Sequence, residues 1–313
     1  MKSPRTLLPA AAVMGSMLLV SCTGEPDGSA EGDDEVITVA TQRQPHLYAP
    51  YVYEDFAPEG VTIEVVPMDN STDQVQALIS GDVDFALTGV PTVITSVSQG
   101  EDVTLIGSGA DGGSGLIGDA DIDGIADLEG REIAHVPGSS QEMALRTLLE
   151  EEGLDPDTDV ELVNLGYADM YDALSAGDVD AFAGAEVGVS MALLDGFEPV
   201  GDIYETPLGS VNIGLATTGT LAEEDPELVD QILDAHAEAV QELESDEEVW
   251  IEGAATQFGF EEEVLEEAVQ NIWLGSEIDE EYRSSMEALT ENMVELDVID
   301  EAPEIDDVVT EVD

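Results

Sequence analysis

The apolar residues of this chain form short β-type runs that alternate with helix-type stretches. In the first part of the chain, runs rich in Val, Ile and Thr predict strands at 36–41, 61–66 and 83–87. Between them, the apolar spacing predicts helices at 47–56 and 73–80. This order is typical of α/β units, in which helices connect parallel strands.

The same order recurs further along the chain. Strands are predicted at 131–136, 160–165 and 179–183, with helices at 141–152 and 168–176 between them. Because βαβ connections place helices on both faces of a parallel sheet, we expect the α/β class and two doubly wound units.

Two stretches of these units are similar in sequence. Ala77–Asp84 and Ala173–Asp180 are identical at six of eight positions, at an offset of 96 residues. That offset is longer than the ~20–50 residues of solenoid repeats. We interpret the stretches as parts of two copies of one unit. The alternative is chance, because glycine is common after any helix.

The connecting loops predict a place for a ligand. Ligands bind doubly wound sheets beyond the carboxyl ends of the strands, so two units that face each other would form a cleft there. The loops expected to line this cleft are 42–46, 69–72, 88–92, 137–141, 166–169 and 184–187.

The C-terminal part of the chain is acidic and strongly helical in pattern. Helices are predicted at 226–243, 246–257, 261–272 and 279–296. Each carries apolar positions at helical spacing, which predicts that it packs on the first lobe and turns its acids to solvent.

The N-terminal residues predict export. A basic start is followed by an apolar run at 7–20, which is too short to span a membrane as a stable helix. Leu19–Cys22 resembles the bacterial lipobox, in which the cysteine is lipidated. Cys22 is also the only cysteine of the chain. We expect a lipid anchor at Cys22 on the extracytoplasmic face of the cell membrane; the alternative is an ordinary secretory signal.

Charge narrows the range of partners. The chain has 73 Asp and Glu against 6 Lys and Arg, for a formal net charge of −67. No basic patch is available to bind phosphates, so nucleic acid is excluded as a partner. At ~1 M salt the Debye length falls to ~3 Å and most self-repulsion is screened. Because the acids are spread along the chain, we interpret them as a surface adapted to high salt.

Four stretches together resemble a known group of proteins. They are Gly81–Gly89, Asp127–Ser140, Ala173–Ala181 and Glu295–Val308. The sequence resembles the substrate-binding proteins of nitrate/sulfonate/taurine-type ABC importers, which have the type II periplasmic binding protein fold. The resemblance spans nearly all of the predicted mature chain, and its motifs point to the family more strongly than to a ligand.

The resemblance implies a domain organisation. It implies two doubly wound α/β lobes joined by a two-strand hinge, with crossings near Leu116–Asp121 and Val211–Thr217 and the C-terminal helices on lobe one. The expected parts are a lipoprotein signal peptide (1–21), an acidic flexible tether (22–35), lobe one (36–118 and 216–313) and lobe two (119–215).

The resemblance also implies a function. It implies a protein that captures a small anionic or zwitterionic organic solute, such as a sulfonate, taurine or nitrate, and delivers it to a transmembrane ABC permease with its ATPase. We expect a monomer without cofactor or metal, because no two His residues have the spacing of metal ligands.

Three alternatives stay open. The ligand could be a pyrimidine that serves as a thiamine precursor, or another heterocycle. The protein could be a sensor rather than a transport subunit. A branch of this fold synthesises the pyrimidine with a cysteine-rich motif, but the predicted mature fold has no cysteine after Cys22, so no enzymatic activity is expected.

Candidate ligand-binding residues come from the cleft loops. Serines before a helix offer hydroxyls and free amides to an anion, although they also serve as ordinary helix caps. An Arg in so acidic a chain could pair with a ligand carboxylate or sulfonate, or with any of the acids. Tyr167 could contact a ligand or pack at the rim. The candidates are Gln42, Arg43, His46, Asn70, Ser71, Thr88, Gly89, Pro91, Thr92, Gly138, Ser139, Ser140, Tyr167 and Glu186.

Overall fold

The computed structural model describes residues 35–58, 60–206 and 209–310. The predicted signal peptide, the lipidation site Cys22 and the predicted tether up to Asp34 lie outside the described residues. Among the described residues, no helix combines the length and the apolar character needed to cross a membrane.

The described residues alternate between strands and helices, as the hydrophobic pattern predicts. In the first half the elements are β1 (Glu35–Thr41), β2 (Val61–Pro67), α1 (Ser71–Ser80), β3 (Phe85–Gly89), α2 (Val90–Ser98), β4 (Thr104–Gly112), β5 (Ser114–Gly118), β6 (Glu132–His135), α3 (Ser140–Glu152) and β7 (Glu161–Asn164). In the second half they are α4 (Tyr167–Ala176), β8 (Ala181–Ala185), α5 (Gly188–Asp195), β9 (Glu198–Gly201), β10 (Ile213–Thr217), α6 (Gly219–Glu224), α7 (Pro226–Ser245), α8 (Glu247–Phe258), α9 (Glu262–Ala268), β11 (Ile272–Leu274), α10 (Glu280–Glu295) and α11 (Ile305–Val308).

The strands form two mixed sheets. The first has the order β11-β4-β10-β3-β1-β2 and the second the order β7-β6-β8-β5-β9. In each sheet the predicted α/β unit forms the parallel part, namely β1, β2 and β3 in the first and β6, β7 and β8 in the second. Strands from the connecting segments complete the sheets in antiparallel pairs. The α/β class and the two-unit architecture are confirmed.

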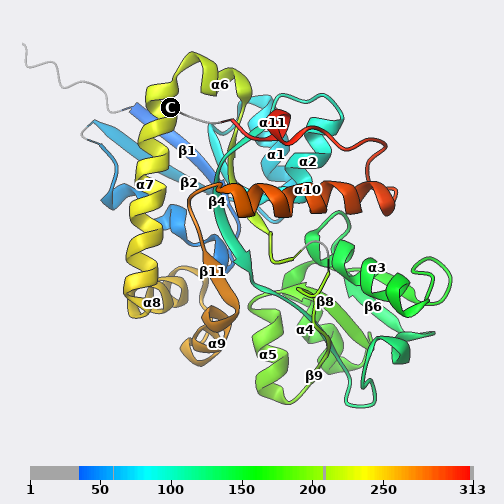
Figure 1. The fold of residues 1–313 in the computed structure, drawn as a ribbon. Coiled ribbons are helices and arrows are strands. Elements are labelled where there is room, and N and C mark those ends of the chain that lie inside the picture. The colour runs from blue at the N-terminus through cyan, green and yellow to red at the C-terminus, as the bar shows by residue number, and fades with distance from the viewer. Residues whose placement is uncertain (1–34, 59, 207–208, 311–313) are drawn as a thin grey trace, which may run out of the picture. The chain divides into compact units, whose positions relative to one another are not determined.

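Both sheets bury both faces, as a doubly wound fold requires. Because successive side chains point to opposite faces of a strand, neighbouring residues enter different cores. In β3, Phe85 packs in the core under α7, whereas Ala86 packs in the core under α1, α2 and α10. In β8, Phe182 and Ala183 divide in the same way between the cores under α4 and α3. Figure 1 shows α7 and α10 on either side of the first sheet.

The repeated sequence has the same local structure in both units. Gly81 ends α1 with φ of 73°, and Gly177 ends α4 with φ of 73°. A positive φ is strained for residues with a Cβ, so glycine terminates both helices in the αL conformation.

Two predicted helices differ from the structure. The stretch at 47–56 forms 3₁₀ helices at Pro45–Leu47 and Ala49–Asp55, each with a proline in its first turn. The stretch at 261–272 is helical only to Ala268, passes through a 3₁₀ turn and then pairs as β11 with the edge strand β4. Tertiary pairing overrides the local helical spacing there.

The chain changes sheets at one glycine. β4 belongs to the first sheet, β5 to the second, and only Gly113 separates them. This crossing lies before the stretch Leu116–Asp121 expected from the resemblance, because β5 pairs with β8 and β9. The chain returns between β9 and β10. The division into lobes that move about these crossings stays a prediction.

Candidate functional site

A cavity of about 30 Å³ lies where the carboxyl ends of the two sheets' parallel strands meet; we call it the polar cavity. The first turns of α1, α2 and α3 contribute Ser71, Thr92 and Ser140 to it. Its lining residues are Gln42, Gln44, His46, Leu47, Ser71, Gly89, Pro91, Thr92, Gly138, Ser139, Ser140, Gln141, Tyr167, Ala185, Asn212 and Ile213.

A chain of side-chain hydrogen bonds sets the polarity of the wall from the first sheet. Gln74 donates from Nε2 to the Leu87 carbonyl (2.9 Å), which leaves its Oε1 to accept from Gln42 Nε2 (3.0 Å). Gln42 Nε2 also donates to Ser71 Oγ (3.2 Å), and the Gly89 amide donates to the same oxygen (3.0 Å). The Ser71 hydroxyl accepts twice, so its own hydrogen is free to be donated, and no described residue accepts it.

The wall from the second sheet is a capped helix N-terminus. Ser139 caps α3, since its Oγ accepts from the Glu142 amide (3.1 Å). Glu142 in turn accepts from the Gly138 amide through Oε2 (2.6 Å), so the loop is held against the first turn of the helix. The capping pair leaves the amides of Ser140 and Gln141, in the first helical turn, without partners among the described residues.

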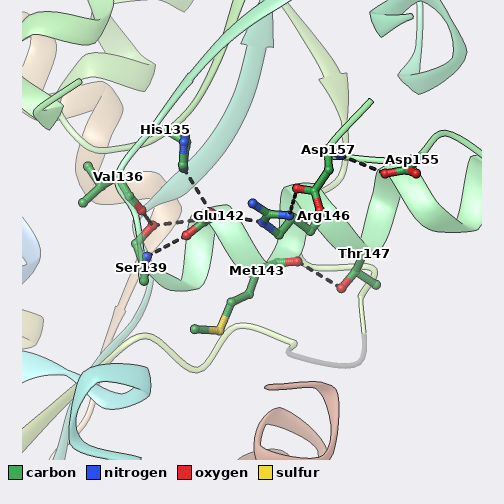
Figure 2. Close-up of polar contacts among 10 residues, drawn as sticks. His135, Val136, Ser139, Glu142, Met143, Arg146, Thr147, Asp155 and Asp157 are labelled. Atoms are coloured by element: carbon green, nitrogen blue, oxygen red, sulfur yellow. Dashed lines mark hydrogen bonds and ion pairs between the residues drawn. The ribbon is translucent and has the colours of Figure 1, made fainter. Parts of the chain in front are cut away.

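Glu142 also anchors a row of charges along α3, on the outer side of the loop. Arg146 Nε donates to Glu142 Oε1 (3.0 Å), and Arg146 reaches Asp157 through Nη1 (3.1 Å) (Figure 2). His135 Nδ1 lies 3.4 Å from Glu142 Oε1, and burial lowers the pKa of His135. The carboxylate is therefore occupied by structural partners and does not enter the polar cavity.

Hydrogen bonds across the cavity join the two sheets. Ser140 Oγ donates to Asn212 Oδ1 (2.8 Å), and Asn212 Nδ2 donates to the Gly112 carbonyl beside the crossing (2.8 Å). Gln141 Nε2 donates to Ser114 Oγ (2.7 Å), while its Oε1 accepts from the Tyr167 hydroxyl (2.8 Å). The cavity floor is thus built from the segments at which the chain passes between sheets.

The polar cavity is electrically unusual for so acidic a chain. None of its lining residues, all of which the structure describes, is Asp, Glu, Lys or Arg. Burial lowers the pKa of His46 to about 3, so its imidazole is neutral, and its buried Nδ1 has no hydrogen-bond partner in the described structure. The polar groups that face the cavity are therefore hydroxyls, amides and helix N-termini, and the helix dipoles favour a negative charge there.

A second space, of about 230 Å³, adjoins the polar cavity; we call it the side cavity. The two share Gln44 and Tyr167. The walls of the side cavity are aromatic and aliphatic, with three charged residues. Its lining residues are Arg43, Gln44, Tyr167, Ala168, Tyr171, Asp172, Glu186, Val187, Gly188, Met191 and Phe260.

The structure brings together most of the residues chosen from the sequence. The predicted residues that line the polar cavity are Gln42, His46, Ser71, Gly89, Pro91, Thr92, Gly138, Ser139, Ser140 and Tyr167. Their contact with a ligand stays a prediction.

Four predicted residues lie outside the polar cavity. Arg43 is exposed and lines the side cavity instead. Asn70 is engaged as the cap of α1, accepting from the Asp73 amide (2.9 Å). Thr88 is fully buried within β3, which runs two residues further than the sequence predicts. Glu186 is 2% exposed, with its carboxyl held by Ser190 and Asn271.

The residues that sequence reasoning missed are Gln44, Leu47, Gln141, Ala185, Asn212 and Ile213. Gln141 could have been predicted, because it follows Ser140 in a predicted cleft loop. The sequence gives no indication for Asn212, because it lies on the segment that returns to the first sheet, far in sequence from Ser140. In the described part of the chain, no group of three or more His, Cys, Asp and Glu side chains is placed to hold a metal ion.

Solved structures share this fold. The alkanesulfonate-binding protein SsuA from Xanthomonas axonopodis pv. citri, bound to MOPS, matches 88% of this chain and 98% of its own with a TM-score of 0.78 and 20% identity. A mutant of the desulfurization enzyme DszB in complex with biphenyl-2-sulfinic acid matches 89% of this chain and 97% of its own, with a TM-score of 0.68 and 17% identity. The fold is therefore that of the periplasmic binding proteins.

Sequence comparison gives the family. The family model described as NMT1/THI5 like matches residues 54–248, more than half of the chain, so the chain belongs to the NMT1/THI5-like family. A curated relative, the nitrate import ATP-binding protein NrtC of Synechococcus elongatus, is 43% identical over 54 residues. That stretch is 17% of this chain and spans only 8% of the relative.

Proposed function

We propose that this protein is the extracytoplasmic solute-binding subunit of an ABC importer and that it captures a small organic anion of the sulfonate type. The observation that carries the proposal is the polar cavity, in which hydroxyls, amides and helix N-termini converge while no carboxylate faces them. In a chain with 73 acids, a cavity of this composition favours an anion over a cation.

The donors of the polar cavity suit oxygens that only accept hydrogen bonds. Ser71 has one hydroxyl hydrogen left to donate, and Ser140 and Gln141 offer amides at the start of α3. Each helix N-terminus contributes about 0.3–1 kcal/mol toward a nearby negative charge. A sulfonate stays ionised and presents three acceptor oxygens, which matches this arrangement.

The side cavity favours an organic substituent on that anion. It begins at Gln44 and Tyr167, where the polar cavity ends, and its aromatic walls can bury a short apolar chain. Burying one CH₂ group contributes about 0.8 kcal/mol. Arg43 and Glu186 also line it, which leaves room for the zwitterionic variant of the ligand, with an amine near Glu186.

The remaining parts of the proposal follow from the sequence. The subunit would be a monomer, anchored through lipidated Cys22, and would deliver its ligand to a transmembrane permease with its ATPase. Closure of two lobes about Gly113 and the segment before β10 would bring Ser140 to Asn212. The similarity to SsuA, whose solved structure holds MOPS, supports this proposal.

An enzymatic function is the second candidate, because DszB has the same fold. The polar cavity does not favour it. It is lined by neither a cysteine nor a carboxylate, and its histidine is held neutral by burial, which lowers the pKa of His46 to about 3. We propose binding without turnover.

Titrations with ligands that differ in charge and in alkyl chain length test the proposed function. Methanesulfonate, butanesulfonate, nitrate, butanol and a hydroxymethylpyrimidine are titrated into the full chain in concentrated KCl by calorimetry. We expect butanesulfonate to bind about fiftyfold more tightly than methanesulfonate, since burying its three added CH₂ groups in the side cavity contributes about 2.4 kcal/mol. Binding by the pyrimidine alone, with no heat from any sulfonate, would overturn the proposal.

A further inference from the structure

A third cavity lies on the other side of the crossing and is larger than the polar cavity and the side cavity. It has a volume of about 500 Å³ and shares no lining residue with the polar cavity. We call it the hinge cavity; its walls are β5, β9 with the segment that follows it, α5, and the end of α9 with the 3₁₀ turn after it. The volume lies in the range of about 300–1,000 Å³ that small-molecule sites occupy.

The hinge cavity has an apolar wall and an acidic wall. Val189, Leu193 and Pro199 belong to the apolar side, which comes from the second sheet and α5. Glu186 and Glu267 belong to the other side, and Asp202 lies on the segment after β9. Of the lining residues, all described, none is Lys, Arg or His, so no protein cation faces these carboxyls within the cavity.

Glu186 is the buried polar group of this cavity and is not fully engaged. It is 2% exposed. Its Oε2 accepts from the Ser190 amide (3.0 Å) and from Ser190 Oγ (2.7 Å), and its Oε1 accepts from Asn271 Nδ2 (3.0 Å). A carboxylate has about four acceptor positions, so one position on Oε1 is left. Burial raises the pKa of Glu186, and the nearby charge of Glu267 raises it further, as expected where a cation is missing.

The contacts around Glu186 also hold the crossing between the sheets. The Glu186 amide donates to the Gly113 carbonyl (2.9 Å), and the Gly113 amide donates to the Asn271 carbonyl (2.7 Å). Tyr204, which lines the cavity, has its hydroxyl within 3.0 Å of Asn271 Oδ1. A molecule in the hinge cavity would therefore contact the segments at which the chain passes from the first sheet to the second.

We propose that the hinge cavity is a second binding site, which takes a primary alkylammonium ion with its nitrogen at Glu186 Oε1 and its alkyl chain against Val189, Leu193 and Pro199. The ammonium supplies the hydrogen-bond donor and the positive charge that the cavity lacks, and the chain covers the apolar wall. A primary ammonium is favoured over a quaternary one because the open acceptor position needs an N–H group.

The test uses the full chain in concentrated KCl and butylammonium chloride as the probe. Binding is followed by calorimetry and by tryptophan fluorescence, because the ring of Trp273 lies 5.4 Å from that of Tyr204 and is half exposed. We expect one site and no binding of butanol.

Two pairs of variants locate the site. Glu186→Gln removes the charge, and about a tenfold or larger loss of butylammonium affinity is expected, the effect of losing a hydrogen bond to a charged group. Leu193→Trp fills the cavity from α5 and should abolish binding without altering the fold. Leu194→Trp is its control, because Leu194 is 47% exposed and does not line the cavity. Glu150→Gln is the control for removal of an acid, at an exposed position on α3.

The outcomes separate the hinge cavity from the other sites. Loss of butylammonium binding in Leu193→Trp but not in Leu194→Trp, with sulfonate binding unchanged in both, would support the proposal. The absence of binding to the wild-type chain would overturn it, and so would equal binding of butanol or displacement of butylammonium by butanesulfonate. Glu186 also lines the side cavity, whereas Leu193 lines only the hinge cavity of the three, so Leu193→Trp tests this proposal separately from the proposed function.

Discussion

Ser140 Oγ donates a hydrogen bond to Asn212 Oδ1 at 2.8 Å and so joins the first turn of α3, on the second sheet, to the segment that enters β10 of the first. Asn212 also donates a hydrogen bond to the Gly112 carbonyl at the end of β4, where the chain crosses to the second sheet. A bond between sheets at the wall of the polar cavity would form and break as the proposed lobes close and open.

Ser140→Ala tests this contact. The variant removes one hydrogen bond across the cavity, and a net contribution of about 0.5–1.5 kcal/mol predicts a loss of affinity for butanesulfonate of about two- to tenfold. Calorimetry measures it. Ser175→Ala is the matched control, because Ser175 is exposed on α4 and does not line the polar cavity; it should leave the affinity unchanged. Unchanged affinity in Ser140→Ala would show that the contact does not contribute to closure around a ligand.

Ser71→Ala tests the direction of the hydrogen bonds in the polar cavity. Ser71 accepts from Gln42 and from the Gly89 amide, so its hydroxyl is directed to donate to the ligand. Because hydrogen bonds to charged groups contribute about 1.5–3 kcal/mol, the variant should bind butanesulfonate at least about tenfold more weakly. Calorimetry again measures the change.

Ser80→Ala is the control for Ser71→Ala, since Ser80 lies on the same helix but outside the cavity. A loss of affinity of equal size in both variants would indicate a general effect on α1 and would argue against a donor role for Ser71.

Because His236 is buried, we expect the free energy of unfolding to fall in acid. Its Nε2 donates to the Ser108 carbonyl (2.7 Å), so its Nδ1 accepts from the Tyr53 hydroxyl (2.7 Å), and burial lowers the pKa of His236 to about 4. The unfolded chain binds this proton near pH 6.5, so the stabilisation is complete above that pH and declines as the pH falls from about 6.5 to about 4.

Denaturant unfolding at about pH 7.5 and about pH 5.5 measures this effect. His236 alone should lower the free energy of unfolding by about 1.4 kcal/mol between the two pH values. The variant His236→Gln should be less stable throughout and should lose this part of the pH dependence. The buried carboxyl of Asp111, whose pKa burial raises to about 7, acts in the opposite direction in both proteins and cancels in the comparison. An identical pH dependence of variant and wild type would contradict the assignment.

The net charge of −67 predicts that salt stabilises the fold. In about 0.1 M KCl the Debye length is about 10 Å, so neighbouring acids repel one another; in about 1 M KCl it is about 3 Å. We expect the midpoint of thermal unfolding to rise steadily over this range. Sorbitol at matched osmolality is the control for effects other than screening, and a midpoint independent of KCl would contradict the interpretation of the acids as an adaptation to high salt.

Local sequence signals predicted the parallel parts of both sheets and the loops at their ends. Val39 and Ala40, or Phe85 and Ala86, lie in strands because adjacent apolar residues suit a sheet buried on both faces. The serines at 71 and 140 could be chosen because hydroxyl residues before or within a first helical turn mark helix N-termini at the cleft. These features depend on residues close together in sequence.

The remaining features of the fold and of the site depend on contacts between segments that are distant in sequence. β11 forms from a stretch with helical spacing because Ile272 and Leu274 pair with the edge of β4. Asn212 reaches Ser140 only after the chain has returned from the second sheet. Glu186, predicted as a ligand-binding residue, turns to Ser190 and Asn271 because α5 and the turn before β11 supply donors there.

The most direct test of the proposed function is a crystal structure of the full chain with bromoethanesulfonate, grown in concentrated KCl and read from the anomalous signal of bromine. We predict the sulfonate between Ser71 and Ser140, and the bromine beside Tyr167, toward Met191. A bromine peak in the hinge cavity or on an exposed surface, with the polar cavity holding no sulfonate, would contradict the account.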